Sequence, residues 1–191
     1  MSTQNPIDQI HLSQGQDVEI EQIESNAPIR VGVSWDFTEG TNPVDLDVAA
    51  IGFDSFGMIL DAAYFNALDV FDGAIKHSGD VQDGKKEGYD ECIDINISRL
   101  PSLVSAIAIV INAHKGGSFI HVESASATIS YMKNGEPTFL ADASLGCGGQ
   151  NTGLLLAGMN ESNTCPIFFP NINCCGHFLS QFSSAIRAAN G

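Results

Sequence analysis

The chain has 191 residues, and its 43% hydrophobic content is enough for one compact domain with a buried core. Eight Lys and Arg residues against 23 Asp and Glu residues give a formal net charge of -15, which argues against nucleic acid as a partner because a phosphate backbone would be repelled. Residues 1–10 lack the basic and apolar regions of a signal peptide, and no long apolar run occurs, so we expect no transmembrane segment and a cytoplasmic location. Five cysteines without framework spacing agree with a reducing compartment.

Apolar and polar residues alternate in four segments, and this two-residue period predicts half-buried strands at 18–21, 29–35, 93–97 and 124–131. The segment 103–111 is apolar nearly throughout and β-branched in its second half, which predicts a central strand buried on both faces. Asn134-Gly135 is typical of a two-residue hairpin turn. Many short strands separated by turns are typical of a β-sandwich.

The last segment of the chain has a different period. Phe178, Phe182 and Ile186 follow one another at steps of four residues within 176–189, which predicts a helix. The sequence therefore predicts an all-β fold, a β-sandwich of two antiparallel sheets with a short C-terminal helix. No shift in composition marks a boundary, so we expect one domain over 1–191, with 1–10 as a flexible N-terminal tail.

The pair Asp45 and Asp47 is the strongest functional signal in the chain. Successive side chains of a strand point to opposite faces, so both carboxylates share one face and Leu46 points to the other. Two carboxylates this close repel each other, and a protein either exposes them to water or neutralises them with a cation. We expect a cation, and a solvated acidic face is the alternative for a bare pair of this kind.

The acidic pair stands in an ordered series of short motifs. In chain order these are Val31-Gly32-Val33-Ser34-Trp35-Asp36, Asp45-Leu46-Asp47, Tyr64-Phe65-Asn66, His77-Ser78-Gly79-Asp80 and Asp90-Glu91. In order and spacing the series resembles the TerD family of tellurium-resistance and general-stress proteins, most densely over 12–112. The resemblance implies a single TerD-like domain, a β-sandwich that binds calcium through acidic loops at one end. It also implies a non-enzymatic stress-response protein whose calcium-organised loops bind an unidentified protein partner or small ligand.

The residue types of this series suit calcium, which takes six to eight oxygen ligands from carboxylates, amides and backbone carbonyls in loops bent by glycine. Zinc prefers Cys and His ligands instead. The predicted metal ligands are Asp36, Asp45, Asp47, Asn66, Asp80, Glu87, Asp90 and Glu91.

We expect one firmly held Ca²⁺ ion, bound by Asp45, Asp47, Asn66, Asp80 and Asp90 with help from Glu87, Glu91 or Asp36. A second ion should bind more weakly. Tyr89 stands where the family pattern has an acid, and Lys85 and Lys86 bring positive charge towards the acidic segment. Ammonium groups compete electrostatically with a cation, and a phenol is a poor calcium ligand at neutral pH.

Two other functions stay open at the level of sequence. A calcium ion that bridges a phosphate group to the acidic surface would give a calcium-dependent nucleotide-binding module of the cyclic-AMP type. Metal-activated water would give a metal-dependent hydrolase. Cys92 with His77 or His114 is a weaker candidate for nucleophilic chemistry. The group of Cys165, Cys174, Cys175 and His177 fits no common zinc spacing, and we interpret it as buried or idle thiols.

Overall fold

A computed structural model of the whole chain describes residues 10–11, 18–19, 27–37, 40, 44–81, 88–114, 119, 122–133, 136–144, 153–160 and 167–168. Within these ranges the chain forms thirteen strands and one short 3-10 helix, η1 (Ile97–Arg99). Across the same ranges, no helix is long and apolar enough to cross a bilayer.

The larger sheet has seven strands and is antiparallel except at one edge, where β1 joins β11 in parallel. Its strands, in spatial order, are β1 (Ile10–His11), β11 (Glu136–Ser144), β10 (Val122–Lys133), β3 (Ile29–Phe37), β8 (Glu91–Ile95), β7 (Ile75–His77) and β6 (Asp69–Val70). Because β3 and β8 lie in its middle, this sheet joins segments that are about sixty residues apart in sequence.

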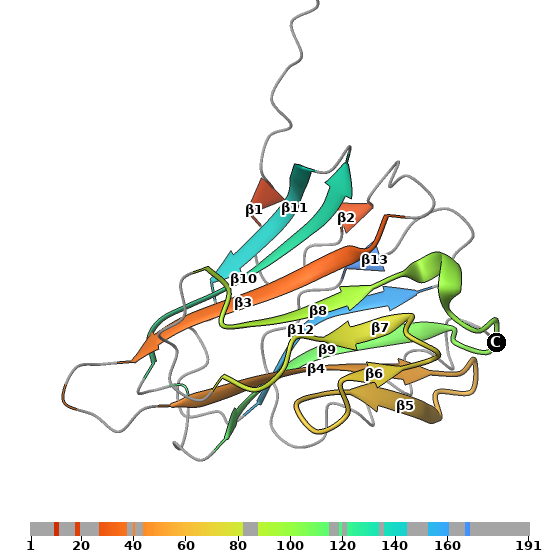
Figure 1. Cartoon of the computed structure of the whole chain (residues 1–191), viewed down its shortest axis with the longest axis horizontal. Coiled ribbons are helices and arrows are strands. Elements are labelled where there is room, and N and C mark those ends of the chain that lie inside the picture. Colours follow the sequence, from red (N-terminus) through yellow and green to blue (C-terminus); the bar gives the residue numbers. More distant parts are fainter. Residues whose placement is uncertain are drawn as a thin grey trace, which may run out of the picture.

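The second sheet has four antiparallel strands, in the order β12 (Gly153–Asn160), β9 (Ala106–His114), β4 (Asp45–Phe53) and β5 (Ile59–Ala63). A short pair of strands, β13 (Ile167–Phe168) with β2 (Val18–Glu19), forms a third small sheet. Figure 1 shows the two larger sheets as layers, with β3 and β10 in one and β4, β5 and β9 in the other. The predicted β-sandwich of two antiparallel sheets is therefore confirmed.

The core lies between the two layers and is built by the alternation that the sequence predicts. On β3, four alternate apolar side chains face inward, each with an exposed fraction of 2% or less: Ile29, Val31, Val33 and Trp35. They meet residues of β4 and β9 such as Leu46, Val48 and Ile109, which are also completely buried. Complete burial of one such side chain stabilises the fold by about 1.5–3 kcal/mol, so this interlayer contact dominates the stability.

The predicted strand at 103–111 begins later than expected, at Ala106, and Leu103 is 61% exposed. Pro101 has no N–H to donate to a ladder, and its carbonyl closes a turn with the N–H of Val104. From Ala106 onward the strand is buried on both faces, as predicted, because Ala106, Ala108 and Val110 form a second apolar cluster on the side away from the main core. Ile97, predicted to end a strand, instead begins η1 and is 40% exposed.

The predicted hairpin is confirmed, because Lys133 of β10 pairs with Glu136 of β11 and leaves two residues for the turn. The predicted C-terminal helix at 176–189 lies outside the described residues and stays a prediction. Most of the predicted tail at 1–10 also lies outside them, and Ile10 begins β1. The expectation of a single domain likewise stays a prediction.

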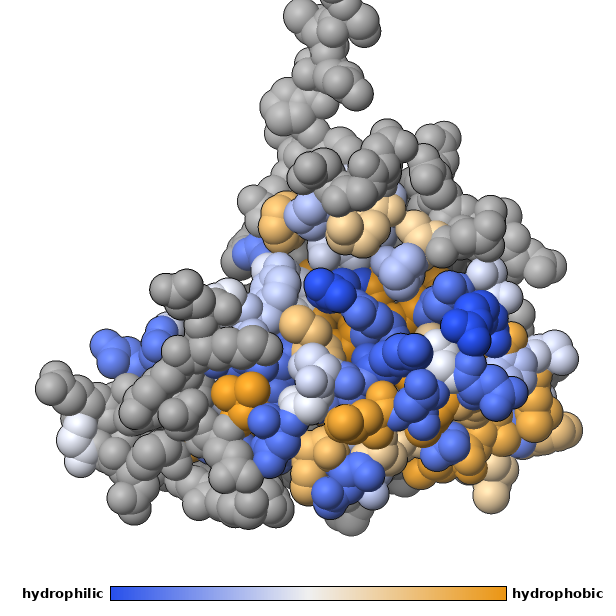
Figure 2. Space-filling view, in the orientation of Figure 1, coloured by the Kyte–Doolittle hydropathy of each residue, from blue (hydrophilic) through white to orange (hydrophobic). Residues whose placement is uncertain are grey.

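The outer face of β3 and β8 is polar, which solvates this side of the larger sheet. Arg30 of β3 makes two hydrogen bonds of 2.7 Å to the carboxylate of Asp94 on β8, and this contact raises the pKa of Arg30 above its ordinary value. Figure 2 shows hydrophilic residues gathered over the middle of the view, where these strands run, and hydrophobic residues towards the lower right, over β5.

Tyr89 lies over this outer face of the larger sheet. A Cβ atom added to Gly32 of β3 would stand 2.5 Å from the ring of Tyr89, which is far below any real contact distance. The ring therefore packs flat on the strand because Gly32 has no side chain.

We expect Gly32→Ala to lower the free energy of unfolding by about 1–3 kcal/mol, because the ring of Tyr89 must leave its position. Tyr89→Ser should remove the clash, so the double variant should recover most of the loss. Urea denaturation of the four proteins in a double-mutant cycle measures this coupling. Additive losses would contradict the packing described for Tyr89.

Candidate metal centre

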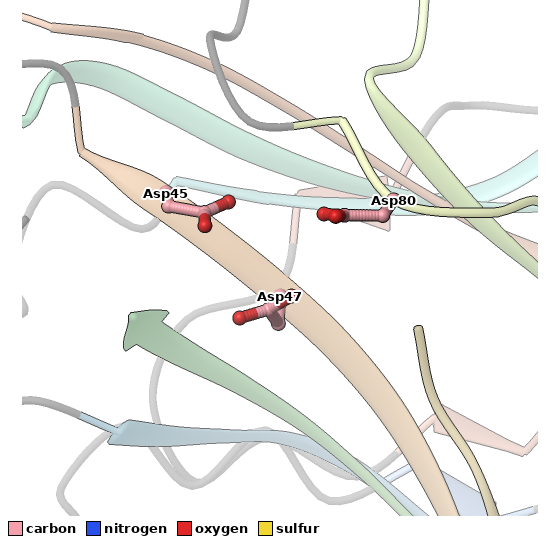
Figure 3. A group of neighbouring side chains, drawn as sticks. All are labelled: Asp45, Asp47 and Asp80. Atoms are coloured by element: carbon pink, nitrogen blue, oxygen red, sulfur yellow. The ribbon is translucent and has the colours of Figure 1, made fainter. Parts of the chain in front are cut away.

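Three of the predicted ligands converge at one edge of the four-stranded sheet. Asp45 and Asp47 belong to β4, and Asp80 belongs to the segment between β7 and β8. Each offers a carboxylate oxygen, and these oxygens all lie within 4.8 Å of one another. Figure 3 shows the carboxylates of Asp45 and Asp80 pointing towards each other above β4. Asp45 and Asp47 are almost completely buried, at 4% and 6% exposed, whereas Asp80 is exposed, so the group opens to solvent on one side.

Strand geometry brings the first two carboxylates together. Leu46 and Val48 are completely buried in the core between the sheets, which sends Asp45 and Asp47 to the other face of β4. Asp47 stands opposite Asn112 of β9. The prediction that the two acids share a face and Leu46 takes the other is therefore correct.

A glycine shapes the segment that carries Asp80. Gly79 has φ of +107°, a region that residues with a side chain rarely adopt. The backbone on both sides of Asp80 is fixed by two buried side chains, those of His77 and Glu91. The backbone N–H of Gly79 donates to Nδ1 of His77 at 3.0 Å, and the N–H of Val81 donates to Oε1 of Glu91 at 3.3 Å. Both neighbours of Asp80 therefore have side-chain partners.

Asp90 and Glu91, two further predicted ligands, are buried and accept backbone hydrogen bonds. Oδ2 of Asp90 accepts the N–H of Trp35 at 2.9 Å, and Asp90 is 2% exposed. The indole of Trp35 in turn donates to the carbonyl of Val44 at 3.0 Å, directly before β4. Glu91 is completely buried, and its Oε2 accepts the N–H of Val48 at 2.9 Å. Neither carboxylate belongs to the group of three.

The other predicted ligands are spread more widely. Asp36 lies on the exposed outer side of β3, where its Oδ2 accepts a hydrogen bond of 2.9 Å from Ser124. Asn66 is exposed in the tight turn between Tyr64 and Ala67. Glu87 lies outside the described residues. The assignment of all eight residues as metal ligands stays a prediction.

Sequence reasoning alone misses the role of His77. The side chain is completely buried, and both ring nitrogens have backbone partners, the N–H of Gly79 and the carbonyl of Val48. It faces inward in register with Ile93, whereas Cys92 lies on the outer side of β8 with Asp94. This arrangement does not favour a nucleophile pair of Cys92 and His77. The alternation of Ile75, Lys76 and His77 is the signal in the sequence that indicates a buried histidine.

The chemistry of the three-carboxylate group suits a hard divalent cation. Calcium–oxygen distances are about 2.3–2.6 Å, so two oxygens on opposite sides of one ion lie about 5 Å apart, and carboxylate oxygens within 4.8 Å of one another can all contact the same ion. Without a cation, three ionised carboxylates at this spacing repel by on the order of 3 kcal/mol for each pair at an effective dielectric constant of about 20. The group contains no Cys or His, the ligands that zinc prefers. The cysteine and histidine group at 165–177 lies outside the described residues.

The fold and this group define a class of protein, a β-sandwich with an acidic candidate cation site at the edge of one sheet. Residues 9–163 match the TerD domain. The chain belongs to the TerD domain family.

Individual relatives agree with this assignment. The chain is 32% identical over 145 residues to "Tellurium resistance protein TerZ" of Serratia marcescens, which covers 71% of this chain and 74% of that protein. It is 32% identical over 111 residues to "General stress protein 16U" of Bacillus subtilis (strain 168), covering 55% of this chain and 58% of that protein. The match to "Tellurium resistance protein TerD" of Serratia marcescens has the same identity and covers 57% of that protein. The alignment with these last two thus spans little more than half of their length.

A solved structure supports the fold. A homologue of telluride resistance protein (TerD) from Streptomyces coelicolor A3(2) superimposes with a TM-score of 0.66 at 16% identity, covering 78% of this chain and 90% of that one. A second solved protein, of unknown function, gives the same TM-score at 21% identity and covers 88% of this chain. At these identities the likeness concerns the fold alone.

We expect Gly79→Ala to lower the free energy of unfolding by about 1–2 kcal/mol, because alanine is strained at a φ of +107°. Steric overlap does not contribute to this loss, because no atom lies within 4 Å of the added Cβ. Gly40→Ala is a matched control, with φ of +83° and equally open surroundings. Thermal denaturation should show similar losses for both variants, whereas a calcium titration should show weaker binding for Gly79→Ala alone. Equal affinity in the two variants would contradict a role of this glycine in placing Asp80.

Proposed function

We propose that this protein is a non-enzymatic calcium-binding stress-response protein of the TerD type. The observation that carries the proposal is the convergence of Asp45, Asp47 and Asp80, whose carboxylate oxygens lie within 4.8 Å of one another. Three negative charges at this spacing, two of them on nearly buried side chains, favour a divalent cation with oxygen ligands. The absence of Cys and His from the group argues for calcium over zinc.

We propose one firmly held ion with Asp45, Asp47 and Asp80 as its ligands, completed by backbone carbonyls, water and further predicted oxygen donors such as Asn66. Bound calcium supplies positive charge, which offsets the repulsion among the carboxylates. The chain's own residues do the rest: β4 holds two carboxylates on one face, and Gly79 turns the third towards them. The predicted second, weaker ion is part of the same proposal.

The biological role is proposed from the relatives. Similar proteins carry the names tellurium resistance protein and general stress protein, and none of these names describes an enzyme. We propose a role in a stress response, in which calcium orders the acidic segment and the ordered surface binds a protein partner or a small ligand. The proposed location is the cytoplasm, because five cysteines without framework spacing agree with a reducing compartment.

Calcium should stabilise the folded protein, because it binds the assembled carboxylates and not the unfolded chain. The gain follows RT ln(1 + [L]/Kd), or about 2.7 kcal/mol at a free calcium concentration one hundred times the Kd. Differential scanning calorimetry at rising calcium should show a rising melting temperature, with a smaller effect of magnesium, which requires a tighter octahedral shell. A melting temperature that responds to neither millimolar calcium nor chelator would rule out the proposal.

The double variant Asp45→Asn, Asp47→Asn should lose calcium affinity by tenfold or more, on the order of 1.4 kcal/mol, and should keep its fold. The change removes two charges while it retains size and polarity. Asp61→Asn with Asp69→Asn is the matched control, because it removes two exposed carboxylates from the neighbouring strands β5 and β6. Isothermal titration calorimetry compares the two. If both double variants lose the same affinity, the effect is general electrostatic attraction and the two strand acids are not ligands.

A further inference from the structure

Among the residues that the structure describes, no strand pairs with β4 beside Val48 on the side of β5. β5 ends at Ala63, which pairs with Ala50, and the chain then reverses in the turn between Tyr64 and Ala67. In an antiparallel strand the N–H and C=O of alternate residues point to the same edge, so Val48 directs both groups to the side where β5 has already ended. Buried backbone groups of this kind need partners, because an unsatisfied one costs about 1–3 kcal/mol.

Two side chains of the opposite sheet take the place of the missing strand. Glu91 of β8 accepts the N–H of Val48 with Oε2 at 2.9 Å, and Nε2 of His77 on β7 lies 3.1 Å from the carbonyl of Val48. Because Nδ1 of His77 accepts the N–H of Gly79, the proton is on Nε2, which donates to Val48. The two side chains are themselves 3.4 Å apart and 0% exposed. They satisfy both backbone groups of the residue that follows Asp47.

The same two side chains hold the segment that carries Asp80. Nδ1 of His77 binds the residue before Asp80, at the N–H of Gly79, and Oε1 of Glu91 binds the residue after it, at the N–H of Val81. One buried pair thus connects the backbone directly after Asp47 with the backbone on both sides of Asp80. The position of Asp80 relative to β4 therefore depends on this pair.

We propose that Glu91 and His77 are positioning residues of the calcium site, which hold Asp80 against Asp45 and Asp47 before an ion binds. This inference rests on the proposed calcium function, and it assigns Glu91 to the support of the site instead of to the ion. A site that is assembled in advance binds more tightly, because the ion does not have to order the segment. Groups behind the ligands typically change metal affinity by 10–100-fold when they are removed.

Three variants test the pair. Glu91→Gln keeps the shape but replaces one acceptor oxygen with an NH₂ donor, so either Val48 or Val81 loses its partner. His77→Leu removes both ring nitrogens. His77→Asn keeps an acceptor near the position of Nδ1, so the contact with Gly79 is retained. The control is Ile95→Ala, which removes a buried side chain from the same strand as Glu91 and lowers stability without touching Val48 or the Asp80 segment.

The first measurement uses the calcium-free protein. Amide hydrogen exchange by NMR should show that the N–H groups of Val48, Gly79 and Val81 are protected in the unmodified protein. In His77→Leu, Gly79 should exchange at least tenfold faster, and in Glu91→Gln the same should hold for Val48 or Val81. Exchange of Ile129, in β10, should not change beyond the shift seen in Ile95→Ala. Unchanged exchange at all three positions would overturn the proposed positioning role, whatever the calcium affinity.

The second measurement is the calcium Kd by isothermal titration calorimetry, well below each melting temperature. We expect Kd to rise about tenfold or more in Glu91→Gln and His77→Leu, less in His77→Asn, and not in Ile95→Ala. If the unmodified protein binds calcium but the variants bind it equally well, or if Ile95→Ala weakens binding as much, the positioning role is wrong and calcium binding stands. If the unmodified protein binds no calcium, the proposed function fails, and the exchange data still decide whether the pair holds the segment.

A third measurement tests whether Glu91 is a positioning residue or a direct ligand of the ion. Terbium replaces calcium in oxygen sites, and its luminescence lifetimes in H₂O and D₂O count the waters bound to the ion. At saturating terbium, Glu91→Gln should show the same water count as the unmodified protein, because no ligand has been lost. An additional bound water in this variant would identify Glu91 as a ligand and overturn its assignment to the support of the site.

Discussion

The edge of β4 at Val48, which no strand in the described part of the chain covers, is the constraint on which the proposed acidic site depends. β4 is longer than its neighbour β5, so its first half, which carries Asp45 and Asp47, extends beyond the ladder on that side. A bare edge inside a folded protein leaves backbone groups without partners or invites another strand. Here Glu91 and His77 from the opposite sheet provide the partners. The same two side chains bind the backbone around Asp80, so this segment lies at the same edge. The same two side chains therefore determine the geometry of the acidic site and close the sandwich at this edge.

Strong local patterns explain why much of the fold can be predicted from the sequence. The alternation over 29–35 places Ile29, Val31, Val33 and Trp35 on one face whatever the strand pairs with, and the structure buries all four. The same rule separates Asp45 and Asp47 from Leu46. Boundaries are less predictable, because they depend on local turns. Pro101 closes a turn with Val104, and β9 begins only at Ala106. Ile97 begins η1 instead of ending β8. Nothing in the local pattern reveals that β1 joins its neighbour in parallel.

The site is harder to predict than the strands, because ligand convergence is a long-range property. An acid-rich series supplies eight candidate ligands, but only the packing of β7 and β8 against β4 shows which carboxylates meet. Asp90 and Glu91 have the residue type of calcium ligands, yet their oxygens accept the N–H groups of Trp35 and Val48 inside the fold. Residue type alone does not distinguish a carboxylate that binds an ion from one that accepts the backbone hydrogen bonds a neighbouring strand would accept. Only Glu91's complete burial and its two backbone partners suggest the second role.

Tyr89 packs on the outer side of the larger sheet. It lies directly before Asp90, so strand-like alternation sends the two side chains to opposite sides of the sheet. Asp90 points inward to Trp35, and the ring of Tyr89 packs outside on the bare backbone of Gly32. Tyr89 therefore contributes packing on the solvent side of the sheet. Asp90 and Glu91 point inward, so neither the contacts at the edge of β4 nor the three-carboxylate group depends on the side chain at position 89.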